Sequence, residues 1–392
     1  MESKRTVYLD NSATTRISDV ALAKYNEVSL SNYGNPSSLH TLGFNAEKEL
    51  KAARQAICAS LGARDAEIIF TASGSEANNL AIIGRAEAKD RFLNNATIIS
   101  TMGEHASVSE PLKKLESRGF KVSYLKTEGG ALDLDELASL CKKDTVLVTM
   151  MMVNNETGAL YDIKRASDII KAKSPDALIH VDATQSYMKI PFTMKSIGAD
   201  MVTVSSHKIA GPKGVGALVI LPGVKKSRGL SPLILGGGQE GGLRSGTENV
   251  PAIAAFGVAA QLGTKNLTSN NIYLESLRKK LIEKITNDKA LSEISITNPQ
   301  SHAPHILNIT LPSIKSETML HFLSAEGIFV SSGSACSSNT GHKSSALLAY
   351  GKSENEADSS IRISFSPLNT EEDLEVLCDA LKRGLSRLVR MR

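Results

Sequence analysis

The sequence predicts an α/β protein whose main sheet is mostly parallel and covered by helices on both faces. Short, apolar, β-branched runs alternate with segments that have the 3.6-residue spacing of amphipathic helices. Fully apolar strands are typical of parallel sheets buried on both faces. At 392 residues, the chain is also longer than one ordinary hydrophobic core requires, which indicates two domains.

The expected elements succeed one another along nearly the whole chain. After a short strand at 7–9, helices are expected at 18–29 and 44–61. The strands expected in the main sheet are 67–71, 97–100, 121–125, 145–153, 178–181, 200–204 and 217–221, with helices between them at 74–88, 109–118, 133–141 and 163–172. Beyond a helix at 250–262, we expect helices at 271–287, 316–326 and 371–389 and strands at 305–310, 328–330 and 361–365. We therefore expect a large domain of residues 16–262 and a small α+β domain of residues 1–15 and 263–392.

Composition excludes several classes of function. The net charge is +4 without a long basic run, so nothing favours nucleic-acid binding. No apolar run approaches the roughly 20 residues of a membrane span, and the N-terminus lacks an apolar signal core. The four cysteines, which are Cys58, Cys141, Cys336 and Cys378, show no zinc-binding spacing, which predicts no metal site. Their small number and the missing signal core predict a reducing, cytoplasmic location.

The most informative stretch, residues 205–216, begins at the end of an apolar strand. Lys208 is badly placed there for core packing but well placed to form a Schiff base, and Ser205 and His207 beside it could hold an anionic phosphate. Taken alone, the same residues are also typical of a hairpin that carries a surface lysine. The neighbouring motifs decide between the two interpretations.

Two further motifs follow expected strands. Gly74 and Ser75 stand at the start of a helix, where free backbone N–H groups bind anions, although Ser75 could equally be a simple N-cap. His105 could stack on an aromatic cofactor and move protons, whereas taken singly it reads as a buried, satisfied histidine.

Asp182 places a carboxylate at the end of another strand. Such a carboxylate, paired with a pyridinium nitrogen, makes the ring an electron sink, while taken alone it reads as a loop cap. One helix or loop plus one strand separates Asp182 from Lys208, so both can face one cleft. Because ligands of such sheets bind at the carboxyl ends of strands, the lysine, the aspartate and the glycine–hydroxyl cup together predict a pyridoxal phosphate site.

Two residues nearer the C-terminus complete the candidate chemistry. Arg362 lies within an apolar strand, where it needs either a structural salt bridge or a substrate carboxylate as partner. Cys336 lies in a loop of small polar residues that suits an exposed nucleophile. The other three cysteines lie on amphipathic helices and read as packing residues.

Together these motifs resemble a known family over nearly the whole chain. The matching stretches are 8–15, 34–38 with His40, 70–79, 104–105, 152–158, 180–185, 205–216, 236–249 and 331–337. They resemble cysteine desulfurases of the NifS/IscS type, within the class V aminotransferase family of fold-type I pyridoxal phosphate enzymes. The resemblance implies a large domain with a mostly parallel seven-stranded sheet and a smaller α+β domain. Two residues depart from the family's pattern. Ser75 stands where the family commonly has a threonine, and Gly241 stands where a larger residue often follows the Gln-Glu pair.

The resemblance also implies a role for each site residue. Lys208 would bind the cofactor covalently, Asp182 would pair with its ring nitrogen, and His105 would stack on the ring. The phosphate would be held by Gly74, Ser75, Ser205 and His207, and by Thr247 from the partner subunit of a homodimer. Gln185 and Asn155 would lie near the ring hydroxyl. Arg362, with Asn155, would bind the substrate carboxylate, and Cys336 would accept the sulfur.

The function implied is conversion of L-cysteine to L-alanine, with sulfur left on Cys336 as a persulfide for an acceptor such as an iron–sulfur scaffold. A selenocysteine lyase shares these motifs and stays open as an alternative. A plain aminotransferase would have no use for Cys336, and a non-catalytic scaffold would be expected to lose Lys208 or Cys336.

Overall fold

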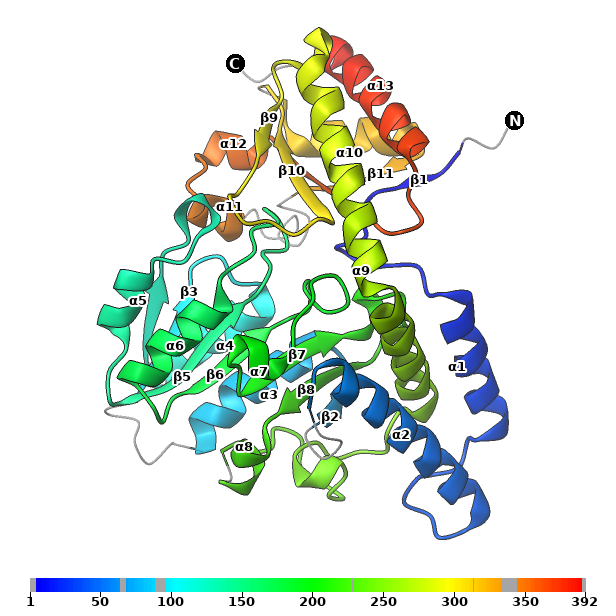
Figure 1. Cartoon of the computed structure of the whole chain (residues 1–392), viewed down its shortest axis with the longest axis vertical. Coiled ribbons are helices and arrows are strands. Elements are labelled where there is room, and N and C mark those ends of the chain that lie inside the picture. The colour runs from blue at the N-terminus through cyan, green and yellow to red at the C-terminus, as the bar shows by residue number, and fades with distance from the viewer. Residues whose placement is uncertain are drawn as a thin grey trace.

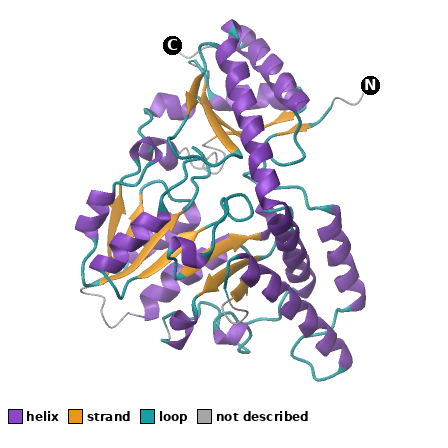
Figure 2. Ribbon diagram, in the orientation of Figure 1, coloured by secondary structure: helices purple, strands orange, loops and turns teal. Residues whose placement is uncertain are grey.

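A computed structural model describes residues 5–63, 68–88, 96–227, 229–312, 314–332 and 344–389. Figure 1 shows a larger lower part built on one sheet and a smaller upper part built on a second sheet. The predicted α/β class is confirmed, and helices flank the larger sheet in the layered arrangement of Figure 2.

The larger sheet has seven strands in the order β2-β8-β7-β6-β5-β3-β4. Their bounds are β2 Ile68–Thr71, β3 Thr97–Thr101, β4 Lys121–Leu125, β5 Thr145–Met151, β6 Leu178–Asp182, β7 Met201–Ser205 and β8 Gly216–Ile220. The run from β4 to β7 is parallel, and β8 pairs antiparallel with both of its neighbours. The short connection from β7 to β8 leaves no room for the crossover that a parallel pair requires.

Helices cover both faces of this sheet because successive strand residues point to opposite sides. Ile98 of β3 belongs to an apolar cluster with α3 (Gly74–Ala88) and α4 (Ala106–Ser117). Its neighbour Ile99 belongs to the cluster on the other face. That cluster includes residues of α2 (Thr41–Ser60), α5 (Leu134–Leu140), α6 (Ile163–Lys173), α7 (Met194–Ile197) and the long helix α9, while α8 (Pro222–Lys226) follows β8.

The long helix α9, Val250–Asn287, has 38 residues and corrects one expectation. The sequence predicted separate helices at 250–262 and 271–287, because the intervening residues are polar and include Gly263. The structure has one uninterrupted helix, capped by Asn249, whose first part packs on α2 and on α1 (Asp19–Ser31). Tertiary contacts override weak local propensity here: Asn271 donates to the Lys189 carbonyl at 2.8 Å.

The smaller sheet has the order β12-β13-β10-β9. Its strands are β9 Ser295–Thr297, β10 Ile306–Thr310, β12 Ser331–Ser332 and β13 Ser360–Ser364, with helices α10 Ser316–Ala325, α11 Ser345–Ala349, α12 Glu354–Asp358 and α13 Glu371–Arg387. Near it, β1 (Val7–Tyr8) pairs with β11 (Ile328–Phe329), which brings the N-terminal segment to the C-terminal part of the chain. The domain limits given above stay a prediction. Within the described residues, no helix combines the length and apolarity needed to cross a membrane.

Candidate active site

A cleft of about 510 Å³ opens where the ends of β5, β6 and β7 face the smaller sheet. Most sequence-predicted site residues line it: Gly74, Ser75, His105, Asn155, Asp182, Gln185, Ser205, His207, Lys208 and Arg362. The sheet explains this convergence, because parallel strands bring the residues that follow them to one edge.

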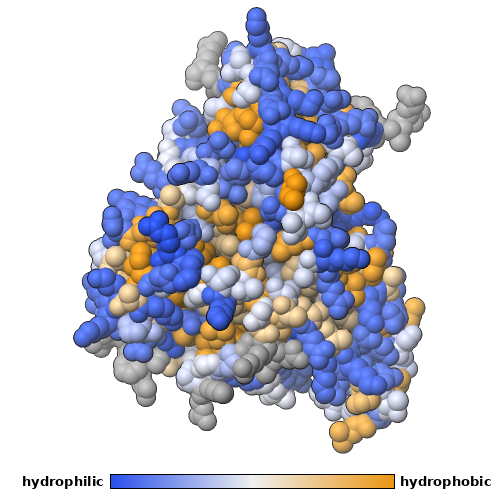
Figure 3. Space-filling view, viewed as in Figure 1, coloured by the Kyte–Doolittle hydropathy of each residue, from blue (hydrophilic) through white to orange (hydrophobic). Residues whose placement is uncertain are grey.

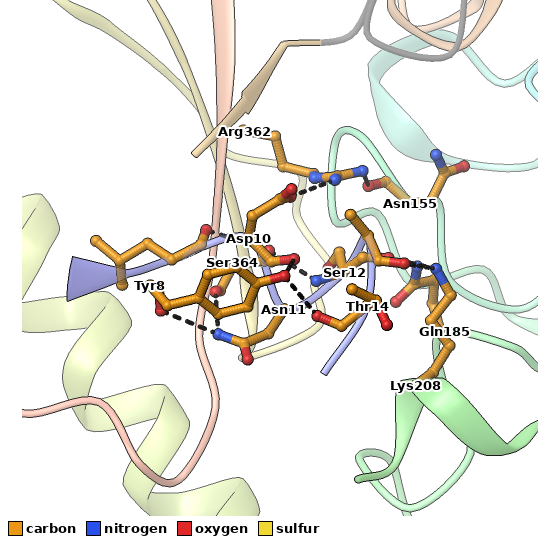
Figure 4. Close-up of polar contacts among 12 residues, drawn as sticks. Tyr8, Asp10, Asn11, Ser12, Thr14, Asn155, Gln185, Lys208, Arg362 and Ser364 are labelled. Carbon is orange, nitrogen blue, oxygen red and sulfur yellow. Dashed lines mark hydrogen bonds and ion pairs between the residues drawn. The ribbon is translucent and has the colours of Figure 1, made fainter. Parts of the chain in front are cut away.

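Lys208 lies in a short 3₁₀ turn that follows β7. Its ammonium donates to the backbone carbonyls of Ser12 at 2.6 Å and Ala13 at 2.7 Å, as Figure 4 shows for Ser12. The adjacent His207 contacts the Thr14 hydroxyl through Nδ1 at 3.1 Å. Burial, followed by the charge of Lys208, lowers the pKa of His207 to about 4, so its imidazole is neutral at pH 7.

Asp182 ends β6 and is held in place by two donors. Asn78 of α3 donates to Oδ2 at 2.7 Å, and the Thr184 backbone N–H donates to Oδ1 at 2.9 Å. Beneath it, His180 contacts the hydroxyls of Thr149 and Thr203 at 2.8 and 3.0 Å. Burial lowers the pKa of His180 to about 4, which leaves the carboxylate without a charged imidazole beneath it.

His105 is the N-cap of α4, and its Nδ1 accepts from the Ser107 N–H at 3.1 Å. The ring is exposed to the cleft, so the alternative of a buried histidine is wrong. The surrounding protein nevertheless lowers the pKa of His105 through desolvation, against the attraction of Asp182. A neutral imidazole therefore faces the cleft.

Gly74 and Ser75 form the start of α3 at the floor of the cleft. Ser73, rather than Ser75, caps this helix, because the Glu76 N–H donates to the Ser73 hydroxyl at 3.1 Å. The alternative of Ser75 as N-cap is therefore wrong. A Cβ on Gly74 would lie 3.3 Å from both the Ser205 Cβ and the Thr184 Oγ1, so glycine keeps this hollow open.

Arg362 of β13 joins the smaller sheet to the cleft. Its Nη2 lies 2.8 Å from Asp10 Oδ1, and Nη1 donates to the Asn155 carbonyl at 2.9 Å (Figure 4). The structural salt bridge considered from sequence is thus present. Because Arg362 also lines the cleft and its Nε has no hydrogen-bond partner in the described part of the chain, donor capacity remains.

Comparison with known proteins identifies the family. Residues 7–377 match the aminotransferase class-V family. The chain belongs to this family. It is 37% identical to cysteine desulfurase IscS 1 of Archaeoglobus fulgidus, over 97% of both chains. A solved NifS-like protein is 36% identical with a TM-score of 0.91, covering 98% of this chain and 100% of the other. The solved structure described as SspA in complex with cysteine is 32% identical with a TM-score of 0.79, covering 93% and 100%.

The cleft fits pyridoxal phosphate, the cofactor of class-V aminotransferases. The Ser205 hydroxyl is buried beside the Gly74 hollow and has no hydrogen-bond partner among the described residues. The same holds for Gln185 Oε1, whose Nε2 donates to the Ser12 carbonyl at 3.0 Å. A phosphate at the α3 N-terminus and a polar group near Gln185 would satisfy these atoms.

Sequence reasoning assigned no role to several residues that shape this site. Asn78 orients Asp182, and Asp10 pairs with Arg362. Glu104 accepts from the Thr101 hydroxyl and the Met151 N–H, and burial raises its pKa to about 8. Glu156 accepts from Ser344, and burial raises its pKa to about 7. The sequence signal for Glu104 and Glu156 is their position shortly after apolar strands, whereas no local pattern marks the roles of Asn78 and Asp10.

The remaining two predicted site residues are Cys336 and Thr247. Cys336 lies outside the described residues, and so does most of its loop. Thr247 is exposed and does not line the cleft of its own chain. The remaining three cysteines are buried, as expected for packing residues.

Proposed function

We propose that this member of the aminotransferase class-V family is a pyridoxal phosphate-dependent cysteine desulfurase. The observation that carries the proposal is the meeting of Lys208, Asp182 and the Gly74 hollow in one cleft. Relatives named cysteine desulfurase, matched over nearly the full length, support the same activity. Its cytoplasmic location stays a prediction from the few cysteines.

The chain's own side chains would hold and orient the cofactor. Gly74, Ser75, Ser205 and His207 would surround the phosphate at the positive end of α3. Asp182, fixed by Asn78 and Thr184, would face the ring nitrogen; Gln185 and Asn155 would lie near the ring hydroxyl, and His105 against the ring. The cofactor supplies a carbonyl that captures amines and a ring that takes up electrons from the α-carbon.

Arg362 would bind the carboxylate of L-cysteine, with Asn155 beside it. Its two Nη atoms hold Asp10 and the Asn155 carbonyl without substrate, which fixes the guanidinium plane toward the cleft. A planar guanidinium suits a carboxylate because it can donate two parallel hydrogen bonds. Lys208, as a neutral amine, would accept the α-proton, and the neutral His105 would assist in moving it.

Cys336 would take the sulfur. Its thiolate attacks the sulfur of bound L-cysteine, a sulfur–sulfur bond forms, and the carbon–sulfur bond breaks. The electron pair stays with carbon, which gains a proton to give alanine, and a persulfide remains on Cys336. A thiol or an acceptor protein, such as an iron–sulfur scaffold, would then remove this sulfur.

A homodimer would complete the site with Thr247 of the partner subunit. The exposure of Thr247 outside its own cleft supports a contact across an interface. Apolar side chains also remain exposed around the connection from α1 to α2, seen at the lowest point of Figure 3; they are Leu30, Tyr33, Leu39 and Phe44. Exposed apolar clusters of this kind favour protein contacts.

The deciding experiment incubates purified, cofactor-loaded protein with L-cysteine and a thiol reductant and quantifies alanine and sulfide. We expect equimolar products from the natural chain. Cys336→Ser should abolish both products while the yellow colour of the bound cofactor remains. Undiminished alanine and sulfide in this variant would remove Cys336 from the mechanism, and absence of alanine in the natural chain would overturn the function.

Selenocysteine offered in parallel tests the alternative of a selenocysteine lyase. A desulfurase should retain activity with L-cysteine as the sole substrate. Release of selenium from selenocysteine, with no turnover of L-cysteine, would replace the desulfurase with the lyase.

A further inference from the structure

One edge of the His105 ring is bound to the start of α4. Its Nδ1 accepts from the Ser107 backbone N–H at 3.1 Å and lies 2.8 Å from the Ser107 hydroxyl oxygen. Because a backbone N–H can only donate, Nδ1 presents its lone pair and carries no proton. Desolvation lowers the pKa of His105, so the ring is neutral at pH 7. A neutral imidazole has a single N–H, which therefore lies on Nε2.

The Ser107 hydroxyl is oriented by Asn78. The Asn78 side chain is buried, and its Nδ2 lies 2.7 Å from Asp182 Oδ2 and 2.8 Å from the Ser107 hydroxyl oxygen. Since the carboxylate only accepts, the amide must turn its NH₂ group toward it, and the second hydrogen reaches Ser107. The serine oxygen is thus an acceptor from Asn78, and its own proton is left to donate to His105. An accepted hydrogen bond also makes a hydroxyl a stronger donor.

The other edge of the His105 ring is available to a ligand. His105 lines the same cleft as Asp182 and Lys208, and Nε2 has no hydrogen-bond partner within the described ranges. The ring therefore has two unlike edges. Nδ1 accepts from the protein, while the N–H on Nε2 is free to donate in the cleft.

We propose that Ser107 is a positioning residue that, oriented by Asn78, holds the His105 proton on Nε2 and makes this imidazole a hydrogen-bond donor in the cleft. Such a ring does not accept the α-proton, because its only lone pair is already occupied. The base is then Lys208, and His105 assists it by donating to negative charge that develops on the bound molecule. This inference rests on the proposed function, because it divides the roles within that site.

The charged groups around His105 are consistent with a neutral ring. Desolvation is the strongest influence on its pKa, Asp182 favours the imidazolium, and Lys208 and Arg362 oppose it. The preceding residue, Glu104, turns toward β3 and β5, where it accepts two hydrogen bonds. Burial raises the pKa of Glu104 to about 8, so it adds little negative charge at pH 7.

The test is two-bond proton–nitrogen NMR of cofactor-loaded protein labelled at the histidine ring nitrogens, which needs no turnover. The two nitrogens of each ring give separate shifts, and these show which nitrogen carries the proton. His105→Gln identifies the His105 signals among the 8 histidines of the chain. At pH 7 we expect a protonated Nε2 and an unprotonated Nδ1.

Ser107→Ala removes the hydroxyl and leaves the backbone N–H in place. The pKa of His105, followed by the same shifts, should rise by up to about one pH unit, since one donor to the unprotonated nitrogen is lost. Ser107→Thr keeps a hydroxyl and should restore the natural value. Ser117→Ala, at the other end of α4, is the matched control, because the Ser117 hydroxyl bonds the Lys114 carbonyl.

Three results would overturn the proposal. A proton on Nδ1 at pH 7 in the natural chain would contradict the assigned form of His105. An unchanged His105 pKa in Ser107→Ala would show that the hydroxyl has no such role, and a rise that Ser107→Thr fails to reverse would assign the effect to packing. Failure to convert L-cysteine would overturn the proposed function instead, since the spectra require cofactor binding alone.

Discussion

The Asn78 amide of α3 donates to the Asp182 carboxylate at the end of β6 over 2.7 Å, across 104 positions of sequence. This bond fixes the carboxylate at the centre of the cleft. The packing of α3 on the sheet therefore positions the carboxylate that is expected to face the cofactor ring.

Asn78→Ala should lower kcat about tenfold, since a buried carboxylate that loses a donor is misplaced and poorly satisfied. Activity and cofactor absorbance measured together test this. The adjacent Asn79→Ala is the matched control, because Asn79 bonds the Ser75 carbonyl and does not line the cleft. Equal losses in both variants would point to a general defect of α3.

Arg362→Lys should raise KM for L-cysteine by about tenfold to a hundredfold, because an ammonium cannot form the paired hydrogen bonds of a guanidinium. Steady-state kinetics separate KM from kcat. An unchanged KM would show that Arg362 forms a structural ion pair with Asp10 and does not bind the substrate.

Gly74→Ala should weaken cofactor binding about tenfold, since the new Cβ meets Ser205 and Thr184 at 3.3 Å and overpacking costs about 1–3 kcal/mol. Titration of the apoprotein with pyridoxal phosphate measures the affinity. Gly223→Ala in α8 is the control, because a Cβ there meets no atom within 4 Å. Unaltered affinity in Gly74→Ala would place the phosphate elsewhere.

Glu104 should make stability fall as pH rises. Its pKa, raised by burial from 4.5 to about 8, means that the folded state holds a proton that the unfolded state has lost. Between these values, the contribution is at most about 1.4 kcal/mol of unfolding free energy per pH unit. Glu104→Gln removes it, so denaturant unfolding at pH 6.5 and 7.5 should show a less negative slope in the variant. Identical slopes would contradict a protonated Glu104.

Thr247 offers a test of the dimer. Thr247→Ala and Lys208→Ala should each be poorly active alone, whereas a mixed dimer regains one complete site, with Lys208 from one subunit and Thr247 from the other. Activity of co-refolded mixtures should rise above both parents. No recovery, in mixtures shown to contain heterodimers, would argue that Thr247 does not act across the interface.

Local patterns were enough to predict the alternating strands and helices, and with them the residues at the sheet edge. Lys208 and Asp182 could be placed in one cleft because parallel strands impose where their ends lie. The burial of Cys58, Cys141 and Cys378 and the capping of α1 by Ser18 were also predictable from local patterns.

Other features depended on contacts between distant segments. The continuity of α9 came from packing that outweighs weak propensity. The partner of Arg362 comes from a strand register that brings Asp10 beside β13.

The sequence by itself determined the fold class and the residue types of the site, because helix and strand periodicity and catalytic chemistry are local properties of a chain. Tertiary structure alone decided which polar atoms stay unpaired and which charges lie together. Lys189 shows the difference: nothing in the sequence around it marks it as buried, and its burial depends on the folding of a turn against a helix more than 80 positions away.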